Sequence, residues 1–356
     1  MMENSTIQNA AVQFGKGLVT VEMLGSGLIH HTYKVDYSET PSIVLQCINQ
    51  HTFHQPENIV QNYEVVYKYL QQHAGGSIIP KLISTKSGDY FFKDEEGNFW
   101  RATQFIPGSF APTIPGNEKE VFSAARCFAG FTKSLAGLNI QQLAPILPGF
   151  HNLAERYEQF EAAIKKGPVF RLLRATHVIS ELRQKHSLVK FYQKLSDEVN
   201  FPTRVMHHDC KISNVLFEQS GGKAICAVDL DTVMPGKYFS DIGDMIRTMA
   251  CTVNEDSTAW ENIDINKKYY DAILEGYSEG IGDEFTAEEK RNIHKSGLIM
   301  AYMQCMRFVT DFINNDVYYK TSYDEQNLNR ALNQLILVEK LEEFLQEHEY
   351  ENNPLN

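Results

Sequence analysis

The stretch VMHHDCKISNVLFEQSGGKAICAVDLDTVMPG, residues 205–236, decides how the rest of the chain is interpreted. It contains a His-x-Asp-x-x-x-x-Asn element at residues 207–214. Two apolar runs separated by a Gly-Gly pair follow, and the second run ends at the acids Asp229 and Asp231. A carboxylate, then an amide, then a further carboxylate is the order of side chains that is typical of phosphoryl-transfer sites.

The spacing of this stretch predicts a β-hairpin. Residues 215–218 and 224–228 are apolar and rich in β-branched side chains, and both glycines between them tolerate positive φ. In a hairpin centred on the glycines, residues equidistant from them face each other, and Asn214 and Asp229 are equidistant. Directly opposed side chains have Cβ atoms roughly 5 Å apart. One Mg²⁺ ion with oxygen ligands at about 2.1 Å bridges such a span.

The hairpin therefore assigns candidate roles. Asn214 and Asp229 are candidate Mg²⁺ ligands, and Asp209 is the candidate catalytic residue that orients an attacking hydroxyl. The alternative is a surface hairpin with ordinary polar ends. Cys210 beside Asp209 has no evident base to activate it and is not expected to act as a nucleophile.

The composition limits the partners. The chain has 356 residues, 43% of them hydrophobic, which is enough for a sizeable core and suits two lobes better than one compact unit. A formal net charge of −12 without a long basic run makes nucleic acid or an anionic membrane an unexpected partner. Six scattered cysteines without a Cys-x-x-Cys pair, and no leader-like N-terminus, predict a cytoplasmic protein. The oligomeric state stays open.

A glycine-containing loop stands near the N-terminus. Residues 18–24 and 33–37 have strand-like patterns, and Gly25, Ser26 and Gly27 lie between them. Glycines allow backbone N–H groups to approach phosphate oxygens closely, so this loop is a candidate cover for the triphosphate of ATP. A hairpin whose glycines have no ligand is the alternative reading of the same pattern.

The next strand, residues 42–48, departs from the usual kinase pattern. A kinase places a phosphate-pairing lysine on this strand, whereas this chain has Gln46 and no basic residue within the strand. Gln46 hydrogen-bonds phosphate as a neutral group, or a nearby cation replaces the lysine, or ATP affinity depends on metal and backbone. In the remaining alternative, Gln46 is an ordinary edge-strand residue.

Residues 79–83, 90–93 and 99–106 complete an antiparallel sheet. It ends at Gln104 and Ile106, directly before Pro107-Gly108, where a two-lobed kinase places the backbone that meets adenine. An ordinary strand end is the alternative.

After this sheet the pattern becomes helical. The expected fold is α+β, two-lobed and protein-kinase-like, with an N-terminal antiparallel β-sheet lobe over residues 1–107. The larger C-terminal lobe, residues 108–356, is mainly helical and contains the hairpin. Helical periodicity is found at residues 56–72, 119–138, 153–165, 168–198, 240–251, 267–278, 286–314 and 325–348.

The order of these elements resembles the aminoglycoside phosphotransferase and choline kinase superfamily over essentially the whole chain. Within it, the sequence is most similar to bacterial N-acetylhexosamine 1-kinases. The segments that carry this narrower resemblance are residues 25–32, 44–49, 57–59, 214–217, 228–236, 241–247 and 307–311.

The resemblance implies roles for further residues. Asp209 accepts or orients the attacking hydroxyl, and Asn214 and Asp229 bind the Mg²⁺ that carries the ATP phosphates. Asp231 binds a second metal or the substrate, or only caps the following turn. Asp241 braces the catalytic loop.

For the substrate, Arg307, Asp311 and Tyr319 are candidate contacts. Arg307 and Asp311 are four residues apart, on one face of an expected helix. A hexosamine pocket needs hydrogen-bonding side chains and an aromatic face, which these residues supply. An intrahelical ion pair beside an exposed tyrosine is the alternative.

The resemblance thus implies ATP- and Mg²⁺-dependent phosphorylation of the anomeric (C1) hydroxyl of an N-acetylhexosamine, with a small-molecule sugar as substrate. One alternative keeps the chemistry and changes the acceptor to choline, an amino acid or an aminoglycoside. Another, motivated by Gln46, is a pseudokinase that binds without catalysing.

Overall fold

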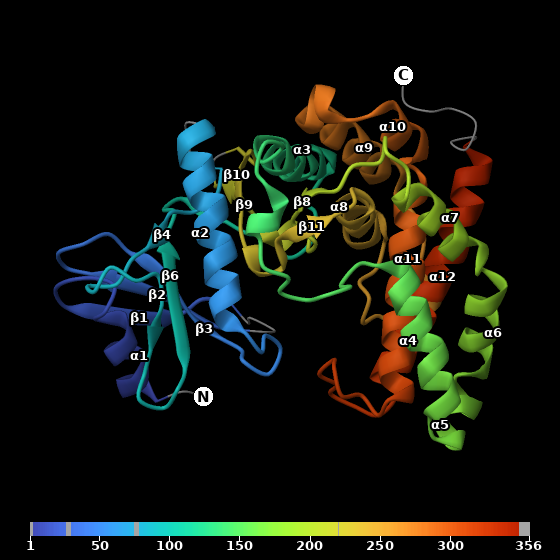
Figure 1. Ribbon diagram of the computed structural model, residues 1–356, viewed down its shortest axis with the longest axis horizontal. Coiled ribbons are helices and arrows are strands. Elements are labelled where there is room, and N and C mark those ends of the chain that lie inside the picture. Colours follow the sequence, from blue (N-terminus) through green and yellow to red (C-terminus); the bar gives the residue numbers. More distant parts are fainter. Residues whose placement is uncertain (1–2, 26–29, 75–77, 220, 349–356) are drawn as a thin grey trace.

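The computed structural model describes residues 3–25, 30–74, 78–219 and 221–348. Figure 1 shows two lobes, one built on an antiparallel sheet and one mainly helical. This confirms the α+β, two-lobed fold class. The expected division at residue 107 falls between the last long strand of the sheet and the short strand Ser109–Phe110, and it remains a prediction.

The N-terminal sheet is antiparallel, with strand order β1-β2-β3-β6-β4 and β5 also paired with β6. Side chains along β2 and β3 alternate in burial, as expected for strands with one face on a core. The strands are β1 (Val19–Met23), β2 (His31–Tyr37), β3 (Ile43–Ile48), β4 (Leu82–Ile83), β5 (Phe92–Lys93) and β6 (Phe99–Gln104).

Two helices complete this lobe. α1 (Asn4–Ala11) buries its small apolar residues against β2 and β3. α2 (Pro56–His73) packs in a second apolar cluster, which contains Leu82 of the sheet together with Leu230 and Val233 of the other lobe. Both lobes therefore contribute to this second apolar cluster, which limits how far they separate.

The helical lobe is organised around α11 (Lys295–Ile313), most of whose side chains are buried. Two small strand groups, β10-β9-β7 and β11-β8, lie between this helix bundle and the N-terminal sheet (Figure 1). The strands are β7 (Ser109–Phe110), β8 (Arg204–Met206), β9 (Val215–Glu218), β10 (Ala224–Ala227) and β11 (Met234–Gly236). The other helices are α3 (Glu118–Ser134), α4 (Leu153–Lys166), α5 (Val169–Arg174), α6 (Thr176–Gln184), α7 (Ser187–Ser196), α8 (Phe239–Met245), α9 (Lys267–Ile281), α10 (Ala287–Asn292) and α12 (Gln326–Glu347).

Two expected helices are interrupted. Residues 168–198 form α5, α6 and α7 instead of one helix, and residues 286–314 form α10 and α11. No glycine or proline lies between residues 169 and 196, so no local stop signal exists there. Within α5, Arg171 instead contacts the end of α11, because its Nη1 donates to the Phe312 carbonyl at 2.6 Å. Tertiary contacts override the helical pattern here.

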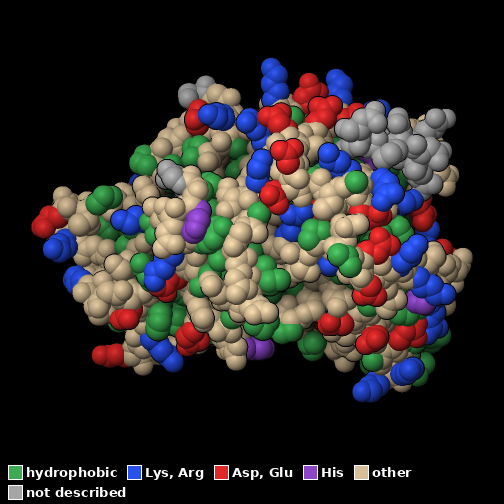
Figure 2. Space-filling model, turned by 45° about the horizontal axis from the view of Figure 1, so that its top comes forward, with side chains coloured by type: hydrophobic (Ala, Val, Ile, Leu, Met, Phe, Trp, Pro, Cys, Tyr) green, Lys and Arg blue, Asp and Glu red, His purple; other side chains and the backbone are tan. Residues whose placement is uncertain are grey.

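Among the described residues, no helix is long and apolar enough to cross a membrane. Lys and Arg side chains are interspersed with Asp and Glu over the face that Figure 2 shows.

Candidate active site

The expected hairpin is present as β9 and β10, but its register differs from the prediction. Ala227 pairs with Val215, and the Val228 N–H donates to the Asn214 carbonyl at 2.9 Å. Asn214 therefore faces Val228 and not Asp229. The register shifts by one residue between Ala224 and Cys226, and such a bulge is not visible in the apolar pattern.

The hairpin connection is also longer than a two-residue Gly-Gly turn. The Glu218 N–H donates to the Lys223 carbonyl at 2.9 Å, which closes a connection over residues 219–222. Gly222 has a φ of +64°, and Ser220 lies outside the described residues. At the other end of the hairpin Asp229 has a φ of +60°, a left-handed conformation that turns its backbone away from the ladder.

A buried carboxylate braces the catalytic loop, residues 207–214. Asp241, on α8, accepts the His207 N–H at 3.0 Å and the His208 N–H at 2.8 Å. The His207 ring packs edge-on against Phe128, and its Nε2 lies 2.9 Å from the Val228 carbonyl. His208 has a φ of +68°, a strained conformation that these contacts hold. The bracing role expected for Asp241 is the arrangement found in the structure.

Within this loop, Asp209 is held by two neighbours. Its Oδ2 accepts from Asn214 Nδ2 at 2.8 Å and lies 2.9 Å from Lys211 Nζ. Burial works to raise the pKa of Asp209, but the Lys211 ammonium and the Asn214 amide outweigh it and the pKa is lowered. Asp209 is thus an oriented carboxylate that stays ionised at neutral pH.

Asp229 lies in the opposite environment. Among the described residues it has no hydrogen-bond or ion-pair partner, and burial together with Asp231 and Asp209 raises its pKa. A carboxylate repelled by two others, at the same end of the hairpin as Asn214, belongs to a donor set that fits a divalent cation such as Mg²⁺. No cluster of three or more His, Cys, Asp or Glu ligands occurs in the described part of the chain, so a metal here needs oxygens from its ligand as well.

Two residues further on, Asp231 belongs to what we call the interlobe cluster, formed by His30, Gln46, Arg101 and Asp231. Arg101, on β6, pairs with Asp231, and His30 Nε2 lies 2.5 Å from Asp231 Oδ2. Both oxygens of Asp231 are therefore engaged. Burial opposes ionisation of Asp231, but Arg101 and His30 outweigh it and place its pKa well below the ordinary value.

Gln46 is the fourth member of this cluster. It is the cross-strand partner of Arg101, which donates through Nε and Nη2 to Gln46 Oε1 at 3.0 and 2.9 Å. Gln46 Nε2 donates to Thr32 Oγ1 at 3.3 Å. The cation that β3 lacks is thus present on the adjacent strand, but its side chain is only 2% exposed and points at Asp231.

Of the other candidate nucleotide contacts, Gly25 is exposed with a φ of +70°, and no atom lies within 4 Å of where a Cβ would stand. Ser26 and Gly27 lie outside the described residues. Gln104 is the last residue of β6, and the Ile106 carbonyl accepts from Ser109 Oγ at 2.6 Å in the connection to β7. Their contact with adenine remains a prediction.

The structure brings the three candidate substrate residues together. Arg307, Asp311 and Tyr319 line one cavity of about 160 Å³ between α4, α11 and the loop after α11; Arg156 and Tyr318 line it as well. We call it the arginine cavity. A larger cavity of about 440 Å³ lies between α3 and α9 and includes none of the candidate site residues.

Asp311 does not pair with Arg307 in the described structure. Its oxygens accept the backbone N–H groups of Tyr318 at 2.8 Å and Tyr319 at 2.9 Å, and Asn327 Nδ2 donates to it at 2.9 Å. Asp311 therefore shapes the loop that carries the two tyrosines. Its contact with a substrate remains a prediction.

A chain of polar contacts connects α8 with the loop that follows it in the sequence. Arg247 pairs with Asp244 at 2.8 Å and with Glu255, which lies in the loop after the helix. Burial and the nearby Asp209 raise the pKa of Asp244 although Arg247 opposes them. Asp244 and Asp209 are therefore close enough to repel each other.

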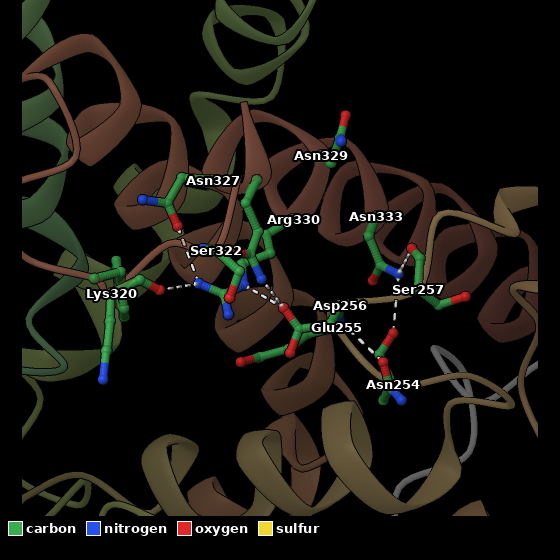
Figure 3. A network of polar contacts seen from close by, with 12 residues as sticks. Asn254, Glu255, Asp256, Ser257, Lys320, Ser322, Asn327, Asn329, Arg330 and Asn333 are labelled. Atoms are coloured by element: carbon green, nitrogen blue, oxygen red, sulfur yellow. Dashed lines mark hydrogen bonds and ion pairs between the residues drawn. The ribbon is translucent and has the colours of Figure 1, made fainter. Parts of the chain in front are cut away.

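Several polar residues join the loop that carries Glu255 to α12 (Figure 3). We call them the clasp: Asn254, Asp256, Ser257, Asn327, Arg330 and Asn333. Arg330 Nε donates to Asp256 Oδ1 at 2.6 Å, and Asn333 Nδ2 donates to the Asn254 and Ser257 carbonyls at 3.1 and 3.0 Å. Arg330 also reaches the Asn327 side chain at 3.1 Å. The clasp thus joins the loop that follows α8 to α12.

Sequence reasoning missed several residues of the site. Arg101 was the lone cation of its strand, and His30 followed the glycine loop closely; both were available signals. Lys211 is within the quoted motif, two residues after Asp209. No sequence pattern indicated Arg156, because Arg307, which lines the same cavity, is far away in the chain.

With this geometry established, comparison with known proteins is informative. A family model described as APH, phosphotransferase enzyme family, matches residues 20–283. The fold is similar to an aminoglycoside phosphotransferase from Alicyclobacillus acidocaldarius, with a TM-score of 0.64, 12% identity, and coverage of 97% of this chain and 96% of that one. An amicoumacin kinase in complex with AMP-PNP, Ca²⁺ and Ami has a TM-score of 0.64, 13% identity and coverage of 95% of this chain and 94% of that one. A microcompartment-associated aminopropanol kinase has a TM-score of 0.60, 13% identity and coverage of 97% and 98%.

Proposed function

The chain belongs to the phosphotransferase enzyme family, and from this membership we propose that it transfers the γ-phosphoryl group of ATP to the anomeric (C1) hydroxyl of an N-acetylhexosamine. The observation that carries the kinase part is the catalytic loop, in which Asp209 is oriented by Asn214 and Lys211 next to the unpartnered Asp229. We also propose that residues 1–107 bind the nucleotide, residues 108–356 bind the sugar, and the protein is cytoplasmic. Its six cysteines are all free.

In this proposal Asp209 accepts a hydrogen bond from the sugar hydroxyl and aims its oxygen at the γ-phosphorus. As the oxygen–phosphorus bond forms and the bond to ADP breaks, the hydroxyl proton passes to Asp209. Lys211, 2.9 Å from Asp209, places positive charge where charge on the transferred group develops. Asn214 and Asp229 would hold Mg²⁺, which neutralises phosphate charge when bound. Because no side chain is phosphorylated, catalysis rests on positioning and electrostatics.

Several contacts support a sugar acceptor over an amine. An aminoglycoside, choline or ethanolamine needs free carboxylates near the acceptor hydroxyl or an aromatic cage for its cation. The one carboxylate that lines the arginine cavity, Asp311, already accepts three hydrogen bonds. The arginine cavity offers guanidinium donors and tyrosine rings instead, which suit hydroxyl and carbonyl oxygens.

An acceptor screen tests the proposal. We would measure ADP formation with N-acetylglucosamine, N-acetylgalactosamine, choline, ethanolamine and kanamycin, and locate the phosphate on the product by ³¹P and ¹H NMR. We expect turnover with an N-acetylhexosamine and a 1-phosphate product. Turnover with only an amine acceptor, or a phosphate on another carbon, would contradict the sugar assignment. No turnover with any acceptor together with retained ATP binding would favour the pseudokinase alternative.

A further inference from the structure

The arginine cavity contains two cations from facing elements. Arg156 is on α4 and Arg307 is on α11, and both line the same cavity of about 160 Å³. Arg307 is only 9% exposed. A guanidinium stays charged at any physiological pH, so burying it without an anion is unfavourable.

Neither arginine has a carboxylate within ion-pair distance among the described residues. Every other arginine of the chain has such a partner. The chain is strongly acidic overall, with a net charge of −12, so acids are not scarce. The two exceptions therefore gather in one cavity in a protein that pairs its arginines everywhere else.

The contacts that these arginines do make are neutral. Arg307 Nη1 donates to Gln304 Oε1 at 2.8 Å, and its guanidinium lies 4.6 Å from the centre of the Phe150 ring. Arg156 donates through Nε and Nη2 to the Phe150 carbonyl, each at 3.1 Å, and through Nη1 to Gln159 Oε1 at 2.8 Å. These contacts orient both guanidinium groups but leave their two positive charges uncompensated.

The surroundings confirm the surplus of positive charge. Burial and the repulsion from Arg307 lower the pKa of Arg156 to about 10. Among the described residues, Asp311 is the only acid that lines the cavity, and its oxygens accept from backbone N–H groups and Asn327. Glu255 is held by Arg247. Neither Asp311 nor Glu255 therefore compensates the positive charges of Arg156 and Arg307.

We propose that the arginine cavity is an oxyanion subsite that takes a carboxylate or phosphate group between Arg156 and Arg307. Its place in the acceptor site rests on the proposed function. A water molecule occupies about 30 Å³ of liquid, so the cavity has room for such a group and for atoms attached to it. The anion is carried by the acceptor, on a substituent remote from the phosphorylated hydroxyl, or is a free ion beside a neutral acceptor.

The first experiment asks whether the subsite exists. We would measure the melting temperature of the full chain in sodium phosphate against sodium chloride of the same ionic strength. The variants are Arg156→Gln and Arg307→Gln, with Arg156→Lys and Arg307→Lys to keep charge, and Arg183→Gln as a control for an exposed arginine. We expect phosphate to raise the melting temperature of the wild type and of Arg183→Gln, and to have no such effect on either Gln variant. Partial recovery is expected in the Lys variants.

The second experiment identifies the source of the anion. We would compare kcat/KM for N-acetylglucosamine with that for N-acetylmuramic acid and N-acetylglucosamine 6-phosphate, which add a carboxylate and a phosphate. At least a tenfold preference for one acidic sugar, lost in both Gln variants, identifies an anion carried by the acceptor. A phosphate effect on melting without that preference identifies a free ion.

The outcomes separate this inference from the proposed function. Equal melting shifts in phosphate and chloride, with no acidic sugar preferred over the neutral one, would overturn the subsite even if N-acetylglucosamine is phosphorylated. A phosphate shift that disappears in Arg156→Gln and Arg307→Gln, without turnover of any sugar, would keep the subsite and overturn the proposed function.

Discussion

The catalytic region with Asp209 and Asp229 and the interlobe cluster with Asp231 provide opposite environments for their acids. Asp231, in the interlobe cluster, has Arg101 and His30 on its two oxygens. Asp229, two residues earlier, has no partner among the described residues and is repelled by Asp231 and Asp209. Asp209 has only Lys211 and an amide.

The presence or absence of a partner distinguishes acids that stabilise the fold from acids that are available to bind a ligand. A buried carboxylate with an arginine and a histidine on its two oxygens stabilises the structure around it, whereas an unpartnered one costs stability unless a cation binds. The arginine cavity repeats the second pattern with the opposite charge. Uncompensated charge in this molecule therefore marks where ligands are expected, and the following predictions test that contrast.

The largest effect is expected for Asp209→Asn. The amide keeps the shape but neither accepts the hydroxyl proton nor carries the charge, so kcat should fall by roughly 10²–10⁴. Asp283→Asn, at an exposed position, is the control. ATP binding measured by calorimetry should remain within about twofold. Wild-type turnover in Asp209→Asn would remove Asp209 from the mechanism.

Arg101→Met should produce the largest loss of stability. It leaves Asp231 with only His30 in a fully buried site, and breaking such a pair costs about 3–5 kcal/mol. Arg183→Met removes a partly exposed pair with Glu161 and should cost no more than about 1 kcal/mol. Urea unfolding of both variants provides the comparison. Equal losses would mean that the interlobe cluster does not fasten the lobes.

The pH dependence of stability should also differ between wild type and Arg101→Met. The pKa of Asp231 is lowered in the fold, so its contribution is fully present above the ordinary carboxyl pKa of about 4 and is lost as the pH falls below it. Wild type should therefore lose more stability between pH 5 and pH 3 than Arg101→Met loses. Parallel stability curves from urea unfolding across this window would speak against the pairing.

Asp229→Asn should separate stability from activity. Since burial and two neighbouring acids raise the pKa of Asp229, its charged form is less favourable in the fold than in the unfolded chain, and the amide should stabilise the apo protein by about 1 kcal/mol. The same change should strongly reduce turnover and weaken the dependence of the melting temperature on added MgCl₂ with ATP. A less stable variant with an unchanged magnesium response would contradict the ligand role.

The smallest effect is expected at the clasp. Arg330→Gln releases Asp256, which is half exposed, so stability should change by less than about 1 kcal/mol. Because the clasp joins the loop of Glu255 to α12, the KM for the acceptor should rise by about two- to fivefold with the KM for ATP unchanged. A double-mutant cycle with Asp256→Asn should show non-additivity. An equal rise in both KM values would indicate general loosening.

Part of this molecule was predictable from local pattern. Strand-like apolar patterns marked β2 and β3, the Gly-Gly pair marked the hairpin, and the motif with Asp209 and Asn214 marked the catalytic loop. The hairpin register was wrong by one residue at Asn214. The connection over residues 219–222 is not centred on the Gly-Gly pair, which displaces the register by two residues, and the bulge between Ala224 and Cys226 restores one of them. The breaks between α5, α6 and α7 were missed because they depend on contacts such as that of Arg171 with the end of α11.

The sequence by itself determined the kinds of elements and the order of the chemical groups, since strand and helix periodicities and motif spacing depend on near neighbours in the chain. Only the tertiary structure decided which charges are paired. Arg101 meets Asp231, and Arg156 meets Arg307, across long stretches of chain. Charge compensation depends on distance and burial after folding, so residues of the same type become structural at Asp231 and available for a ligand at Asp229.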